Sequence, residues 1–507
     1  MKRINSTHVL LILPFILLLS CKKTSPASPK PSGGGNGNPT RVSNTPASIQ
    51  ISLSGSLNAI GKTVQATAIV KDSSGNVLSG QTVVWSSFNE QYLTVNTQGQ
   101  VTVVGIGTTE IRASIGSLMG KLNVEVGANR DVLAKELNCL CDSADYPSTA
   151  PVSFTAPIMQ PDDLAYIVPL GLMIKGHVTP IDHQYYYPVD FLTTKPQKAV
   201  RSPADGYIVR VDRTGQFQVE QQLTPRDNYN VLIQHSCNVY TYYTLITGLT
   251  TELANAVGTI PQGGTKHLHM KVTAGQQVAW VSGQSLDVNV YDINTPAKKW
   301  IIPTNYTEAA KRFATDPFLY YTPGVKTALQ AKTLRTGDPL GGRFDYDEDG
   351  KLVGTWFLQG TNGYQGLPNQ GNDYWRGHLS FAYSVYNTNY LEISIGRWYK
   401  PGATDAQVKE GWQFSVVRNK PDFTTVTQVS GPVKYELAFP EYLLANNQPW
   451  NRQTHQGPMT ITTDRSPVEG VLLVQLMGQR LLKVEAFPGK RASEVSGFTA
   501  NAQLYER

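Results

Sequence analysis

Residues 199–209 read AVRSPADGYIV, which is an apolar segment, a Pro-Ala-Asp-Gly turn and a second apolar segment. Pro and Gly between β-branched segments are typical of a turn that joins two strands. The pattern continues downstream, where residues 229–236 (YNVLIQHS) lead to residues 239–245 (VYTYYTL). Residues 272–284 (VTAGQQVAWVSGQ) then place a glycine turn between two more strands. This succession predicts a β-rich domain in the middle of the chain.

The ordered segments resemble those of the lysostaphin-type zinc peptidases. Members of that family carry a similar Ala-Asp-Gly turn, a strand ending in Asp-His, a Tyr-x-His-Leu segment and a Val-x-x-Gly-x-x-Ile-Gly hairpin. The resemblance implies a small peptidase-like β-barrel, a duplicated hybrid motif, over residues 130–292. It also raises the question of whether the family's zinc site is retained.

The resemblance implies that most of the family's zinc ligands are missing here. Those peptidases hold zinc with a His-x-x-x-Asp motif and the second His of a later His-x-His, and the metal acidifies a bound water. The family's Asp corresponds to Asp190, but Tyr186 stands four residues earlier in place of His. Thr244 replaces the His of Tyr-x-His-Leu, and the His-x-His falls at Asp287-Val288-Asn289. We therefore expect a degenerate barrel, a pseudoenzyme.

A relocated zinc site is the alternative. Residues 175–191 (KGHVTPIDHQYYYPVDF) and 266–270 (KHLHM) hold a surplus of histidines. Alternate residues of a strand share one face, so the two histidines of the second segment point the same way. Three residues of this set would have to meet at one zinc ion; otherwise the histidines belong to solvated turns. The candidate ligands are His177, Asp182, His183, Asp190, His267 and His269.

The N-terminus predicts export and lipid anchoring. A basic start, an apolar run over residues 9–19 and Ser20-Cys21 are typical of a secretion signal, residues 1–21. The run is short for a membrane span. Leu18-Leu19-Ser20-Cys21 resembles the lipobox of bacterial lipoproteins, which implies that Cys21 is lipidated and holds the chain at the outer membrane. The protein would face either the periplasm or the cell surface. Several acyl chains on one residue would anchor it stably.

Two segments follow the signal. Residues 22–47 are rich in Pro, Gly, Ser and Asn, which predicts a disordered tether. Residues 48–128 alternate apolar and polar positions, with a hairpin signal at residues 72–76 (DSSGN). Val84-Trp85-Ser86-Ser87 and Gly99-Gln100-Val101-Thr102 resemble the bacterial immunoglobulin-like domain of group 2. That resemblance implies a β-sandwich that acts as a spacer or an adhesive module.

The C-terminal region, residues 294–507, has few helix signals. Residues 306–314 and 325–334 are amphipathic and predict short helices. The remainder consists of short alternating segments separated by Gly, Asn, Asp and Pro, which predicts a β-sandwich or barrel. Residues 472–487 (LLVQLMGQRLLKVEAF) fit two strands joined around Gly478-Gln479.

An acidic segment in this region suggests a second ion. Asp345, Asp347 and Asp349 alternate before Gly350, as in the opening of a calcium loop. The twelfth position is Trp356 instead of Glu, so an acidic turn without calcium is the other interpretation. Three further aromatic residues, which either stack on sugar rings or belong to the core, are Trp375, Trp398 and Tyr399.

Composition places limits on the function. The 507 residues predict roughly three domains at about 150 residues each, and the fold class is mainly β and multidomain. The net charge of +6 is spread along the chain, which argues against a nucleic-acid partner. A disulfide between Cys237 and either Cys139 or Cys141 fits an oxidising compartment, and the connectivity stays open.

These observations predict a non-catalytic lipoprotein of the cell envelope. It would attach to the membrane through its lipid and present the peptidase-like barrel and the C-terminal β-domain to peptidoglycan, another glycan or an envelope protein. No cofactor is favoured. The alternative is a zinc metallopeptidase that cleaves peptidoglycan peptides with rearranged ligands, and Zn²⁺ and Ca²⁺ are the ions that the alternative sites require.

Overall fold

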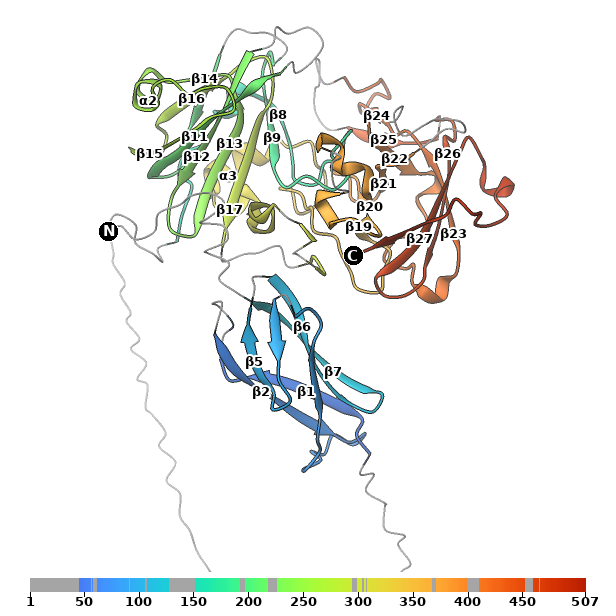
Figure 1. Ribbon diagram of the computed structural model, residues 1–507. Coiled ribbons are helices and arrows are strands. Elements are labelled where there is room, and N and C mark those ends of the chain that lie inside the picture. Colours follow the sequence, from blue (N-terminus) through green and yellow to red (C-terminus); the bar gives the residue numbers. More distant parts are fainter. Residues whose placement is uncertain are drawn as a thin grey trace, which may run out of the picture. The chain divides into compact units, whose positions relative to one another are not determined.

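The structure is a computed structural model, and one compact unit, Pro46–Arg507, holds almost all of its described residues. The predicted mainly β, multidomain architecture is confirmed (Figure 1). Cys21, Cys139, Cys141 and most of the predicted tether lie outside the described residues. No helix in the described part is long and apolar enough to cross a membrane. The described residues are 45–55, 57, 62–90, 92–104, 107–126, 151–191, 197–217, 226–293, 299–302, 305–306, 308–366, 371–398, 410–451, 459–464 and 466–507.

The first β-region has two sheets, ordered β1-β2-β5-β4 and β3-β6-β7. The Asp72 carboxylate accepts hydrogen bonds from the backbone N–H groups of Ser74 and Asn76, so the predicted turn forms. The chain after the turn returns briefly along β2, with an antiparallel bridge between Lys71 and Val77, and the next strand, β3, then pairs with β6. The strands are β1 Ser48–Leu53, β2 Thr63–Lys71, β3 Val84–Ser87, β4 Leu93–Val95, β5 Gln100–Val103, β6 Gly107–Ile115 and β7 Leu118–Val126.

The middle region consists of two open sheets, and the closed barrel of this protein lies further along the chain. A large sheet runs β15-β11-β12-β13-β17-β9-β8, with β18 (Ala314–Thr315) paired to β17, and a small sheet runs β10-β16-β14. The elements are η1 Pro161–Asp163, β8 Leu164–Val168, β9 Gln184–Pro188, β10 Lys198–Arg201, β11 Gly206–Phe217, β12 Arg226–Gln234, β13 Val239–Ile246, β14 Gly248–Leu249, α2 Thr251–Val257, β15 Thr265–Val272, β16 Gln277–Val281 and β17 Leu286–Asp292.

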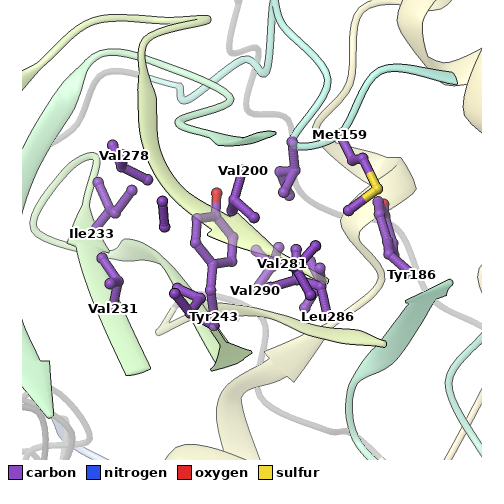
Figure 2. Close-up of a cluster of buried hydrophobic side chains, with 14 of the residues drawn as sticks. Met159, Tyr186, Val200, Val231, Ile233, Tyr243, Val278, Val281, Leu286 and Val290 are labelled. Atoms are coloured by element: carbon purple, nitrogen blue, oxygen red, sulfur yellow. The ribbon is translucent and has the colours of Figure 1, made fainter. Parts of the chain in front are cut away.

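A hydrophobic core lies between these two sheets (Figure 2). Val200 and Val281 come from the small sheet, and Val231, Ile233 and Tyr243 come from the large one. Because side chains alternate along a strand, Leu232 between the two β12 residues points to the opposite face of the large sheet.

That opposite face is also buried, by the start of the C-terminal region. Val209, Leu232, Tyr240 and Tyr291 of the large sheet belong to one core cluster with aromatic residues that follow residue 299. The central strands of the large sheet are therefore covered on both faces, whereas most of β15 at its edge is exposed. The covering aromatic residues are Trp300, Tyr306, Phe313, Phe344, Phe357 and Tyr364.

The edge strand β8 is covered by backbone from the same region. The Ile167 N–H donates to the Lys332 carbonyl at 2.8 Å, and the Leu334 N–H donates to the Ile167 carbonyl at 3.0 Å. Further along, Gly342 has φ +87°, and a Cβ there would collide with the backbone of Leu170. Only glycine allows the two chain segments to approach this closely.

The C-terminal region ends in a closed eight-stranded barrel, ordered β19-β20-β21-β22-β23-β26-β27-β28. The prediction of a sandwich or barrel is confirmed, as are the two strands around Gly478-Gln479. The helix expected over residues 325–334 runs from Pro323 to Gln330, and the described part of residues 306–314 holds the 3-10 helix Ala309–Phe313. The barrel strands are β19 Gly354–Leu358, β20 His378–Tyr383, β21 Leu391–Ile395, β22 Trp412–Val416, β23 Val433–Ala438, β26 Gly470–Leu476, β27 Leu481–Pro488 and β28 Gln503–Glu506.

Shorter elements connect these strands. Cys237, which precedes β13, is disulfide-bonded. A separate two-stranded sheet consists of β24 (Glu441–Leu443) and β25 (Thr460–Thr462). The remaining helices are η3 Ala309–Phe313, η4 Pro317–Leu319, α3 Pro323–Gln330, η5 Gly363–Gln365, η6 Gly371–Gly377, η8 Val417–Asn419, η9 Gln428–Ser430 and η10 Ala492–Glu494.

Candidate functional site

Two of the predicted ligands, Asp182 and His183, meet a third polar residue at the start of β9. β9 pairs with β17 so that Tyr185 lies opposite Asp287. His183 Nδ1 lies 3.4 Å from Asp182 Oδ1, and its Nε2 lies 3.7 Å from Asp287 Oδ2. The imidazole therefore sits between two carboxylates.

Each of the two carboxylates beside His183 has a further polar partner. Lys311 of η3 places its Nζ 3.2 Å from Asp182 Oδ1, and the Thr244 hydroxyl of β13 donates to Asp287 Oδ2 at 3.1 Å. We call the resulting row Lys311–Asp182–His183–Asp287–Thr244 the polar row. Its four charged or titratable side chains are between 4% and 17% exposed, so water reaches the row only at its margin.

Burial and neighbouring charges act differently on the two carboxylates. Burial alone would raise the pKa of Asp182, but the Lys311 ammonium and the His183 imidazole hold that pKa well below its usual range. Burial raises the pKa of Asp287 to about 6, although His183 and the Thr244 hydroxyl act in the opposite direction. At neutral pH Asp182 is a carboxylate, whereas Asp287 titrates close to the working range of most enzymes.

The polar row can hold or pass a proton, but its geometry does not suit a metal. The two nitrogens of an imidazole point in opposite directions, and here each faces a different carboxylate. Both carboxylates and one ring nitrogen therefore do not converge on a single point, as a catalytic zinc site requires. Across the described residues, no group of three His, Cys, Asp or Glu side chains is arranged to hold a metal ion.

Three of the other predicted zinc ligands, Asp190, His267 and His269, lie far from the polar row. Asp190 is exposed at the opposite end of β9, whose five residues span roughly 17 Å. His267 and His269 lie on β15, which β11, β12, β13 and β17 separate from β9, a distance of roughly 24 Å at ~4.8 Å per strand. His177 lies near the polar row, in a turn closed by a bridge to Ile174. Burial lowers the pKa of His177 to about 4, and His183, Lys311 and Asp182 are close enough to act on it as well. The six candidate ligands do not converge.

The positions that the peptidase resemblance singled out are only partly brought together. Thr244 and Asp287 are opposite each other on β13 and β17, and Asn289 lies on the same face as Asp287. Tyr186, at the position of the family's His, instead faces the core between the sheets and is fully buried.

Sequence reasoning missed the two contacts that organise the row. The alternation of HQYYYP could have placed His183 on the face of Tyr185, opposite to Tyr186. Nothing in the local sequence indicated that Lys311, more than a hundred residues later, would reach Asp182.

The three carboxylates of the candidate calcium loop are each paired with an arginine. Asp345 Oδ1 lies 3.1 Å from Arg343 Nε, and Asp349 Oδ1 lies 3.3 Å from Arg480 Nε. Asp347 is buried, accepts a hydrogen bond from the Thr355 N–H at 2.8 Å, and lies 3.7 Å from Arg507 Nη1. Arginines therefore occupy the places where a calcium ion would have to lie, and the acidic-turn interpretation fits better.

The tryptophans considered for sugar stacking belong to the core. Trp375 and Trp398 are each 5% exposed, and Trp398 packs in the barrel interior. Tyr399 lies outside the described residues. The interpretation that these two tryptophans stack on sugar rings is wrong, because other side chains cover them.

Comparisons with known proteins add little. No protein-family model matches the sequence, and no curated protein matches it significantly. A structure of an intimin mutant from EHEC O157:H7 is 18% identical with a TM-score of 0.15, covering 20% of this chain and 62% of that one. Domains 4 and 5 of the S-layer protein SbsC are 13% identical with a TM-score of 0.16, covering 45% and 98%. A putative peptidase M23 from Pseudomonas aeruginosa is 11% identical with a TM-score of 0.16, covering 42% and 84%. Similarities at this level assign no function to the chain.

Proposed function

We propose that this protein is a lipid-anchored envelope protein without hydrolytic activity. Its peptidase-like sheet serves as a support for the C-terminal region, which carries the binding surfaces. The observation that carries this proposal is the burial of the central strands of the large sheet on both faces. A hydrolase would need the face that bears Thr244 and Asp287 to be open to a peptide substrate.

The contacts of Lys311 agree with a structural role of the sheet as the platform on which the C-terminal region packs. Lys311 is 4% exposed, forms an ion pair with Asp182, and lies 5.3 Å from the ring of Tyr364. An ammonium group held in this way ties the C-terminal region to the polar row.

The residues of the polar row are a second argument against hydrolytic activity. One imidazole between two carboxylates offers no open coordination position of the kind that a zinc peptidase uses for water. The Thr244 hydroxyl is bonded to Asp287 and not to His183, so the row lacks the hydroxyl–imidazole pair of a serine-type hydrolase.

The anchor and the partner are part of the same proposal. Lipidation at Cys21 would hold the chain at the outer membrane, and the segment after it would let the β-regions reach the cell wall. A net charge of +6 complements anionic cell-wall polymers. We therefore take peptidoglycan as the partner to test first.

The test uses the chain from Lys22 to Arg507, which contains every described residue. Purified peptidoglycan would be incubated with it, and sedimented protein, released peptides and metal content after dialysis would be measured. We expect salt-sensitive co-sedimentation, no released peptides and no stoichiometric zinc. An Asp190→Ala variant should behave in the same way.

Zinc at about one ion per chain, together with peptide release that Asp287→Asn abolishes, would contradict the proposal and favour the metallopeptidase. Failure to sediment with peptidoglycan, without hydrolysis, would reject this partner and leave the supporting role of the sheet in place.

A further inference from the structure

One end of the closed barrel contains a cavity of about 760 Å³. It lies where β21 and β27 end and where β20 and β28 begin. Pockets of roughly 300–1,000 Å³ at the mouth of a β-barrel commonly hold one small molecule. The floor is apolar and is continuous with the barrel core, through Leu379, Ile395, Leu472, Val484 and Tyr505.

The rim of the cavity is polar, and two of its charged groups are already engaged. Glu485 accepts hydrogen bonds from the backbone N–H and the hydroxyl of Thr499. Lys490 lies on the surface with its Nζ 3.6 Å from Glu494 Oε1. Neither group is left with a strong requirement for a ligand.

Arg397 is the exception on this rim. It is half-buried and lines the cavity. Its Nε is buried and has no hydrogen-bond partner within the described residues. A buried donor without an acceptor is destabilising, and more so when the group is charged. A planar guanidinium pairs most favourably with a carboxylate or phosphate through two parallel hydrogen bonds.

We propose that this mouth binds a small amphipathic anion. Its carboxylate or phosphate group would pair with Arg397, and its hydrocarbon chain would lie along the apolar floor beside Leu379 and Val484. A free fatty acid and a single-chain phospholipid share this chemistry. The inference is independent of whether the protein hydrolyses peptidoglycan, because the polar row belongs to the large sheet of the middle region and the cavity to the closed barrel.

The test is calorimetric titration of the chain Lys22 to Arg507 with laurate below its micellar concentration. Dodecanol supplies the same chain without the charge, and acetate supplies the charge without the chain. We expect laurate to bind at least about tenfold more tightly than dodecanol and acetate not to bind measurably, as for a charge-assisted hydrogen bond in an apolar site. Lauroyl lysophosphatidic acid distinguishes the source, because tighter binding than laurate would indicate a lipid headgroup.

Two variants locate the site. Arg397→Gln should weaken laurate about tenfold and leave dodecanol unchanged, whereas Lys490→Gln removes an equal charge from the same rim and should change laurate affinity less than about threefold. Ala502→Trp should fill the cavity and weaken both ligands; Ala500→Trp replaces it if that variant melts early. Binding of none of the ligands would overturn the proposal. Equal affinity for laurate and dodecanol, unaffected by Arg397→Gln, would do so as well.

Discussion

Lys311 Nζ lies 3.2 Å from Asp182 Oδ1, and both side chains are almost completely buried. The first residue belongs to the C-terminal region and the second to the middle region, so this ion pair joins two parts of the chain that the sequence suggested were separate. Removing one member of a buried pair leaves the other charge without compensation, which is far more costly than removing both.

We expect Lys311→Met to lower the free energy of unfolding at pH 7 by about 3–5 kcal/mol, because Asp182 would remain as an unpaired buried carboxylate. Urea denaturation would measure this. Lys175→Met, which removes a lysine whose side chain is 70% exposed, should change stability by less than about 1 kcal/mol. A double variant, Lys311→Met with Asp182→Leu, should recover much of the loss; no recovery would argue that packing matters more than charge.

Asp287 should make the protein less stable as pH rises between about 4 and 6. Its pKa is about 6 in the folded protein and near 3.8 when exposed, so the folded state binds the proton more tightly. The bound proton stabilises the folded state fully below about pH 4. This contribution falls as pH rises and is lost above about pH 6, where Asp287 is deprotonated in the folded protein as well. Asp287→Asn should flatten this slope in thermal melts at several pH values. Asp162→Asn, at an exposed position, should keep the slope of the original protein.

Arg507 closes the acidic segment 345–350. Besides its ion pair with Asp347, its guanidinium donates to the carbonyls of Val353, Glu348 and Lys351 and lies 4.1 Å from the centre of the Trp356 ring. We expect Arg507→Met to cost about 3–5 kcal/mol in chemical denaturation, because the buried Asp347 would lose its counter-charge. Adding Asp347→Asn to that variant should restore part of the loss, and an additive effect of the two changes would contradict this explanation.

Calcium should not stabilise the protein. Arginines lie against all three candidate carboxylates, so binding a cation would require breaking buried or partly buried ion pairs. The melting temperature should therefore be the same in calcium and in a chelator. A rise with calcium that Asp345→Asn abolishes would show that the arginines yield to the metal.

Gly342→Ala tests the close backbone contact at the edge of the large sheet. The new Cβ would collide with the Leu170 backbone, and φ +87° is strained for alanine. We expect a loss of more than about 3 kcal/mol in unfolding free energy, in the range of severe single substitutions. Gly478→Ala adds the same atom where no other group lies within 4 Å, and it should be nearly neutral.

The strands were largely predictable because their signals are local. The Pro-Ala-Asp-Gly turn at residues 203–206 and the alternation around Gly478-Gln479 depend on neighbours a few residues away, and both appear in the structure. The helix expected at residues 306–314 is shorter than predicted, a 3-10 helix over Ala309–Phe313, and Tyr306 and Phe313 pack in the core beneath the large sheet. Tertiary contacts of that kind override local propensity.

The site was predicted less well, because its members come from distant segments. Asp182 and His183 were among the six candidate ligands, but the sequence could not show that the two ring nitrogens of His183 would meet separate carboxylates. Likewise, the spacing of Asp345, Asp347 and Asp349 describes a calcium loop equally well until the arginines that reach it from elsewhere are known. Spacing determines which residues are neighbours along the backbone, but not which distant charges arrive.

The covering of both faces of the large sheet has a consequence for how the protein is made. The strands that carry Val209, Leu232 and Tyr240 leave the ribosome before Trp300, Tyr306 and Tyr364, which bury their second face, have been synthesised. Until then the apolar second face of the large sheet would be exposed to water and to other nascent chains. A chain truncated near residue 293 should therefore aggregate or be degraded. The middle region becomes stable only after the C-terminal region has been synthesised.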